Sequence, residues 1–227
     1  GATSPQALQT AVKRHKADLG VALDGDGDRL VMVDGAGELY DGDQLLYVIA
    51  RHRKQKGELA GGVAGTQMTN LALEHALARL KVPFARAKVG DRYVLEMLMK
   101  RHWQLGGENS GHIVCLDKHT TGDGIVSALQ VLRALVEQGT TLQKTAGALR
   151  LYPQVLVNVS LKNQRNPMAS PGVKRAVKQA EDDLDGGGRV LLRPSGTEPV
   201  IRVMVEGRRR PQVQRWADTI ADAVRRA

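Results

Sequence analysis

Short apolar runs alternate with segments of helical periodicity over the first 150 residues. The apolar runs predict strands at residues 19–23, 30–33, 61–65, 113–116 and from Pro83 onward. Apolar residues spaced three and four apart predict helices after Asp41, over 73–80, over 91–100 and over 125–136. The last of these helices is marked by Ile125, Leu129, Leu132 and Val136. Such alternation is typical of α/β folds with right-handed βαβ units and a mixed or parallel sheet.

The pattern changes after about Arg150. Residues 155–159 alternate apolar and polar side chains, as a half-buried strand does. Residues 163–172 are polar and contain two prolines, so we expect them to form a loop. The remaining elements that we expect are a helix over 173–184, strands over 189–192 and 200–205, and a helix over 213–224. This order predicts a small α+β domain that is separate from the α/β region.

The composition of the chain limits the kinds of ligand that it is expected to bind. The 227 residues carry a net charge of +9, which favours an anionic ligand, either a nucleic acid or a phosphorylated small molecule. Aromatic residues make up 3% of the chain and are not interleaved with basic clusters, so no stacking platform for nucleic acid is visible. No stretch reaches the length of a membrane span. A single cysteine, Cys115, excludes an internal disulfide and fits the reducing cytoplasm, where we expect the protein.

Three carboxylates sit at alternate positions of a Gly-rich loop between two predicted strands: Asp24, Asp26 and Asp28. Three unpaired carboxylates that converge repel one another, and a divalent cation is the simplest way to hold them ionised. Hard oxygen ligands favour Mg²⁺ or Ca²⁺. We therefore expect a metal loop, with Arg29 at its mouth.

A hairpin turn and a calcium EF-hand are the structures that compete with a Mg²⁺ loop here. A hairpin turn accounts for Asp-Gly steps but not for a third aspartate followed by arginine. An EF-hand that begins at Asp24 would need glycine at Arg29 and glutamate at Gly35, and strands rather than helices flank the loop. The pattern favours a Mg²⁺ loop over both.

A second chemical loop runs from Arg193 to Pro199. Arg193, with Arg202 on the following strand, brackets the hydroxyl groups of Ser195 and Thr197, and Gly196 permits close approach of backbone N–H groups. The alternative is a polar hairpin with a surface arginine, but two arginines that bracket two hydroxyl groups favour a phosphate-binding loop. The sequence has no Walker-type P-loop.

Two further loops are weaker candidates. Residues 106–112 hold Glu108, Asn109, Ser110 and His112 between glycines. This set suits the hydroxyl groups of a sugar, with His112 as an acid or base or as a structural hydrogen-bonding residue. Lys88 and Arg92 add positive charge between a predicted strand and helix, where α/β sheets place ligand contacts.

Taken in order, these four loops resemble the α-D-phosphohexomutase family over essentially the whole chain. The resemblance implies a partial second domain at 1–40, a complete third α/β mixed-sheet domain at 41–149, and a small α+β fourth domain at 150–227. Asn109 and residues 88–93 resemble the members that act on an amino sugar. Mannose- or glucose-phosphate mutases of the same family, and a non-catalytic phosphosugar-binding module, remain alternatives.

The resemblance also implies a reaction. A phosphoserine and a bisphosphate intermediate would move phosphate between the 6 and 1 positions of glucosamine, for cell-wall precursor synthesis. Asp24, Asp26 and Asp28 would bind Mg²⁺, and Arg29 and His112 would be catalytic. The residues expected to bind substrate are Lys88, Arg92, Glu108, Asn109, Ser110, Arg193, Ser195, Gly196, Thr197 and Arg202.

One departure from the family is large. The Ser-His-Asn-Pro motif that carries its phosphoserine does not occur in this sequence. We therefore expect this chain to be inactive by itself. The partners that we expect are a phosphorylated amino sugar and an N-terminal half of the same enzyme, with a homodimer left open, and neither nucleic acid nor a membrane.

Overall fold

A computed structural model of the chain describes residues 1–160, 167–195 and 198–227. It divides into two compact units, Gly1–Leu151 and Tyr152–Ala227. The fold is mixed α/β, as predicted. Among the described residues, no helix has the length and apolar character that crossing a membrane requires.

The first unit contains two sheets. An antiparallel sheet has the order β1-β2-β3, with strands Leu19–Leu23, Leu30–Asp34 and Leu39–Tyr40. A mixed sheet has the order β5-β4-β6-β7, with β4 (Val63–Thr66) parallel to β5 (Phe84–Ala87) and β6 (Leu105–Gly107). Strand β7 (Ile113–Cys115) runs antiparallel to β6. The carboxyl ends of β4, β5 and β6 therefore share one edge of the sheet.

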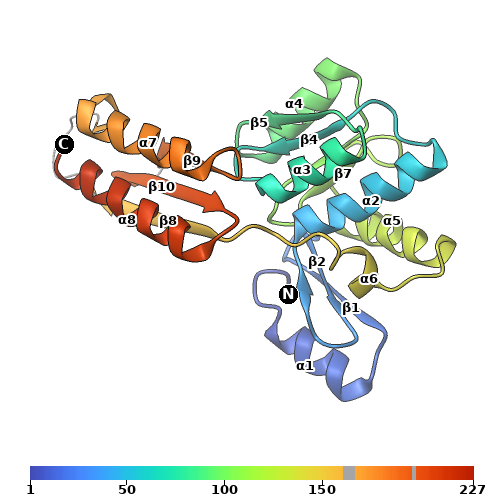
Figure 1. Cartoon of the computed structure of the whole chain (residues 1–227). Helices are drawn as coiled ribbons and strands as arrows, with labels where there is room; N and C mark the ends of the chain where they lie inside the picture. The colour runs from blue at the N-terminus through green and yellow to red at the C-terminus, as the bar shows by residue number, and fades with distance from the viewer. Residues whose placement is uncertain (161–166, 196–197) are drawn as a thin grey trace. The chain divides into compact units, whose positions relative to one another are not determined.

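The helices of this unit, shown in Figure 1, are α1 (Gln6–His15), α2 (Gly42–Lys56), α3 (Leu71–Arg79), α4 (Asp91–Arg101), α5 (Gly124–Glu137) and α6 (Leu142–Thr145). Helix α2 begins as predicted, because Asp41 forms a capping box with Gln44. The predicted strands at 19–23 and 30–33 and the helix over 91–100 are also confirmed.

Two features of this unit do not follow from the apolar pattern of the sequence. Helix α5 exists, but three of the apolar residues that indicated it, Ile125, Leu129 and Val136, are exposed. Its buried face consists of Ser127, Ala128, Val131, Ala134 and Leu135 together with its first glycine. Gly106 and Gly107, expected in a polar loop, lie buried in β6. A Cβ at Gly106 would come within 2.8 Å of the Ala64 carbonyl oxygen, so the glycine permits close strand packing.

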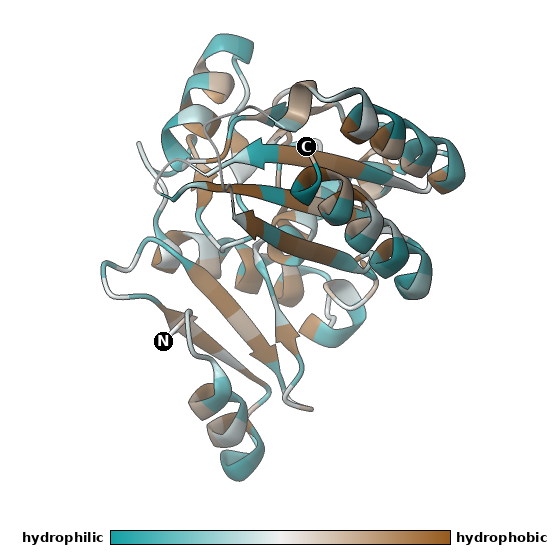
Figure 2. Cartoon of the chain, turned by 90° about the vertical axis from the view of Figure 1, so that its left-hand side faces the viewer, coloured by the Kyte–Doolittle hydropathy of each residue, from teal (hydrophilic) through white to brown (hydrophobic). Residues whose placement is uncertain are grey.

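The second unit is a three-stranded antiparallel sheet of order β8-β10-β9, with strands Gln154–Ser160, Val200–Gly207 and Gly188–Pro194. Helices α7 (Pro171–Leu184) and α8 (Arg210–Arg225) lie side by side on one face, after a short 3₁₀ turn, η1 (Pro167–Ala169). In Figure 2 the strands are coloured largely as hydrophobic, and the helices carry extensive hydrophilic segments. On β10, Ile201, Val203 and Val205 face the helical core. Arg202 therefore lies on the opposite face, as the alternation predicted.

Candidate active site

The aspartate loop joins β1 to β2, which pair up to Leu23 and Leu30. One carboxylate oxygen from each of Asp24, Asp26 and Asp28 lies within 4.8 Å of the others. The backbone N–H of Arg29 donates to Oδ1 of Asp24 over 3.1 Å, and its Nε lies 3.6 Å from Oδ2 of the same residue. The loop thus gathers the three carboxylates beside one guanidinium.

The electrostatics of the loop are those of crowded carboxylates. Burial raises the pKa of Asp28, and the charges of Asp26 and Asp24 add to that rise against the opposing effect of His112. Burial also acts to raise the pKa of Asp24, but the hydrogen bond from the Arg29 backbone and the Arg29 charge lower it overall. Oδ1 of Asp28 is buried and has no hydrogen-bond partner among the described residues. A cation beside this oxygen would satisfy it and offset the repulsion.

His112 faces this loop. Its ring is buried, and Nε2 lies 3.5 Å from Oδ2 of Asp28. A backbone bridge between Arg29 and His112 and a hydrogen bond from the Leu30 N–H to the Gly111 carbonyl tie the two segments together. A Cβ at Gly122 would overlap the His112 ring, so this glycine leaves the space that the imidazole fills.

The predicted sugar loop begins at Glu108, directly after β6. Oε1 of Glu108 accepts the Gly90 N–H over 3.0 Å, which links this loop to the one that follows β5. The Gly42 N–H donates to the Asn109 carbonyl over 3.1 Å, so the start of α2 braces the loop. Ser110 is exposed at the tip. The carboxylate, amide and hydroxyl are therefore held on a backbone with defined contacts.

The two basic residues after β5, Lys88 and Arg92, do not point to a common site. Lys88 is exposed, and its Nζ lies 5.6 Å from the centre of the Tyr93 ring. Arg92 donates to Glu96 over 2.8 Å and is 80% exposed. The structure thus joins the backbone of this loop to Glu108 but pairs the Arg92 side chain along its own helix.

A neighbouring loop was missed from the sequence. Residues 67–70 follow β4 at the same sheet edge as the loops that begin at Lys88 and Glu108. Asn70 caps α3, and its N–H donates to Oδ2 of Asp43 over 2.7 Å. The available signal was its place at the carboxyl end of a parallel strand, where α/β folds bind ligands.

Cys115 carries no reactive character. It lies buried in β7, and burial raises the pKa of its thiol to about 11. At neutral pH the group is therefore a thiol and not a thiolate.

The second unit places the two arginines predicted to bind phosphate opposite each other. Arg193, which lies on β9 and not in the loop where it was expected, pairs in register with Arg202 on β10. Nη2 of Arg202 donates to Oγ of Ser195 over 3.3 Å and lies 3.6 Å from Oε2 of Glu198. Burial, and then the charge of Arg202, lower the pKa of Arg193. Gly196 and Thr197 lie outside the described residues.

Comparison with known families decides the assignment. The description "Phosphoglucomutase/phosphomannomutase, alpha/beta/alpha domain III" matches residues 41–152. The C-terminal domain of the same family matches residues 156–223. The chain belongs to the phosphohexomutase family. The resemblance drawn from the sequence motifs is thereby confirmed.

The family members that this chain resembles are about twice as long as the chain. A phosphoglucosamine mutase of Nitrosospira multiformis is 62% identical over 227 residues, which are 100% of this chain and 49% of that protein. The Aspergillus fumigatus N-acetylphosphoglucosamine mutase has a TM-score of 0.77 at 24% identity, over 100% of this chain and 52% of that one. The same fungal enzyme in complex with GlcNAc-6P and magnesium has a TM-score of 0.74 at 22% identity, over 90% and 52% of the two chains. This phosphohexomutase chain thus spans about half the length of its relatives.

Within this phosphohexomutase chain, the structure gathers the predicted residues into two groups. The first unit brings the three aspartates, Arg29 and His112 together, and it joins Glu108 to the backbone of the loop after β5. The second unit brings Arg193, Ser195 and Arg202 together. The division of the first unit near residue 40 stays a prediction.

Proposed function

We propose that the enzyme to which this chain contributes is a phosphoglucosamine mutase, which interconverts glucosamine 6-phosphate and glucosamine 1-phosphate. The observation that carries the proposal is the convergence of Asp24, Asp26 and Asp28 beside His112. Relatives 56–62% identical over nearly the whole chain bear that name, which supports the amino-sugar substrate. By resemblance, the product enters the synthesis of cell-wall precursors in the cytoplasm.

The three aspartates fit Mg²⁺. They are hard oxygen donors that lie close together, and one of their oxygens is buried without a partner in the described part of the chain. When bound, the ion would neutralise charge on the transferring phosphoryl group. Arg29 would add a positive charge at the mouth of the loop. His112 would hold Asp28 in place and exchange a proton with a sugar hydroxyl.

Substrate binding divides between the two units. Glu108 and Ser110 would hold sugar hydroxyls, with Asn109 beside them, and Lys88 and Arg92 would supply positive charge. The second unit would hold the phosphate that is not reacting. The residues proposed for that role are Arg193, Ser195, Gly196, Thr197 and Arg202.

The chain by itself would lack a phosphoryl donor, because the serine motif of the family does not occur in it. The test is to assay the 227-residue chain with glucosamine 6-phosphate, Mg²⁺ and a trace of the bisphosphate. A separately produced N-terminal half is then added. We expect turnover only from the mixture or from the full-length enzyme. Turnover by the chain alone would overturn the proposed dependence on that half, and an inactive full-length enzyme would overturn the proposed reaction.

A further inference from the structure

The face of the second unit's sheet that lies opposite helices α7 and α8 carries two rows of polar side chains. Strand register places Gln154, Glu206 and Arg189 side by side in the first row. It places Asn158, Arg202 and Arg193 side by side in the second. Each member of the second row is separated by four residues from its counterpart on the same strand. Because antiparallel pairing geometry repeats every two residues, the two rows have the same pairing geometry.

The first row is internally satisfied. Glu206 is fully buried at its centre, and its carboxylate accepts from both neighbours. Gln154 donates to Oε2 over 2.8 Å, and Arg189 donates to Oε1 over 2.8 Å. An acceptor between two donors needs no external ligand.

The second row has the opposite composition. A donor, Arg202, occupies the centre, and a second arginine faces it directly, an arrangement that is destabilising in the absence of an anion. Nε of Arg202 is buried and has no hydrogen-bond partner within the described parts of the chain. The carboxylate near Arg202, on Glu198, is 60% exposed and 3.6 Å away, so it screens the pair weakly.

Asn158 completes this row from the other side. It is exposed on β8 and lies directly opposite Arg202. Side chains of directly opposed residues lie about 4.5–5.5 Å apart at Cβ, so its amide can reach a group held by Arg202. A phosphate has acceptor oxygens for both arginines, for the Ser195 hydroxyl and for an amide N–H.

We propose that Asn158 is a further phosphate-binding residue, which donates its side-chain N–H to the same phosphate group that Arg193 and Arg202 hold. This inference rests on the proposed function, because that function names the phosphate. The amide occupies the position at which Gln154 donates to Glu206 in the satisfied row. Here the acceptor is supplied by the ligand instead of by the protein.

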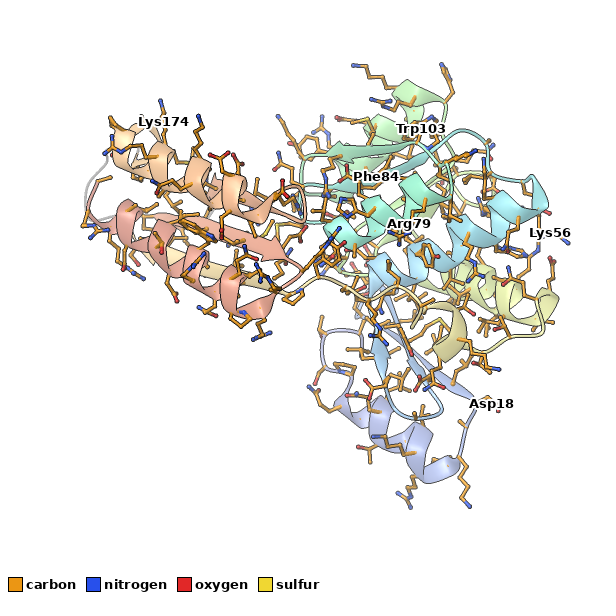
Figure 3. The ribbon with its side chains drawn as sticks, in the orientation of Figure 1. Asp18, Lys56, Arg79, Phe84, Trp103 and Lys174 are labelled. Atoms are coloured by element: carbon orange, nitrogen blue, oxygen red, sulfur yellow. The ribbon has the colours of Figure 1, made fainter. Side chains whose placement is uncertain are left out.

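The test is a titration of the chain with inorganic phosphate at low ionic strength. Binding is monitored through the chemical shifts of the backbone amides in NMR spectra. Asn158→Ala should weaken phosphate binding about 3- to 10-fold, the range of one neutral hydrogen bond. Asn158→Asp should weaken it more than about 10-fold through repulsion of the anion. The same variant should raise Tm, because it gives Arg202 an internal acceptor. Lys174→Ala, a control on the outer face of α7 (Figure 3), should change neither quantity.

The outcomes separate the two claims. If Arg193→Ala weakens binding and Asn158→Ala does not, the role of Asn158 is wrong and the phosphate site stands. If neither variant weakens phosphate binding, or the unaltered chain does not bind phosphate, both the role of Asn158 and the proposed phosphate site are wrong. A fall in Tm for Asn158→Asp would contradict the account of the two rows.

Discussion

Nε2 of His112 lies 3.5 Å from Oδ2 of Asp28. The buried imidazole ring fits there because Gly122 has no side chain that would overlap it. Asp28 is one of the three converging carboxylates, so the imidazole bears directly on the shape of the aspartate loop. Displacement of the ring should therefore disturb the loop without removing a charged group.

Gly122→Ala tests this relationship, because the added methyl would overlap the His112 ring. In the full-length enzyme we expect kcat to fall about 100-fold or more, the low end of a lost acid–base or positioning contribution. The ring signals of His112 should shift in NMR spectra. Gly172→Ala is the matched control, since its Cβ would meet only the Ser170 hydroxyl at 3.7 Å. Unchanged kcat in Gly122→Ala would show that the position of the ring does not matter.

Arg193→Ala tests the phosphate row. The variant removes one of two arginines that face each other, so we expect KM for glucosamine 6-phosphate to rise about 10-fold or more, as for a charge-assisted hydrogen bond. The Mg²⁺ concentration that gives half-maximal turnover should stay constant, because the aspartates are untouched. Steady-state kinetics with both ligands varied provides the measurement. A constant KM would remove Arg193 from substrate binding.

Glu137 gives a prediction for stability against pH. Hydrogen bonds from Arg133 and then His52 lower the pKa of this carboxyl to about 2 from its usual value of 4.5. A pKa that is lower in the folded state contributes stability above the unfolded value, and that stability is lost as pH falls through the folded value. Glu137→Gln should therefore lower the urea midpoint at pH 7 and have a progressively smaller effect from pH 4.5 toward about 2.

The control for that prediction is Glu96→Gln. Glu96 also accepts from an arginine, Arg92, but both side chains are more than half exposed. Solvent screens such exposed pairs, so the urea midpoint of the Glu96→Gln variant should differ little from that of the unaltered chain at any pH. Glu137→Gln could lower the urea midpoint by the same amount at about pH 3 as at about pH 7. The ionised contacts of Glu137 with Arg133 and His52 would then not be the cause of the lower stability.

Local chemistry in the sequence predicted the aspartate loop well. The alternate spacing of Asp24, Asp26 and Asp28 and the strands around them depend on neighbouring residues, and the structure brings the carboxylates together. The cap of α2 by Asp41 is equally local. Sequence spacing also indicated which residues of β10 face the core, because strand alternation has a fixed period.

Long-range relationships could not be predicted in this way. Apolar periodicity identified α5 but not which of its faces the rest of the unit covers, so Ile125 and Val136 turned out exposed. Strand β6 contains one leucine and two glycines and resembles a loop until the close approach of β4 is known. The opposition of Arg202 to Asn158 and Arg193 depends on strand register, which no single strand encodes.

The most direct test of the account is ³¹P NMR of the full-length enzyme with glucosamine 6-phosphate and Mg²⁺. The unaltered enzyme should convert the 6-phosphate resonance into that of glucosamine 1-phosphate until equilibrium is reached. Asp26→Asn, which removes one of the three converging carboxylates, should slow this conversion by at least about 100-fold if the ion supplies several kcal/mol of stabilisation to the transition state. No conversion by the unaltered enzyme, or equal rates for both proteins, would contradict the account.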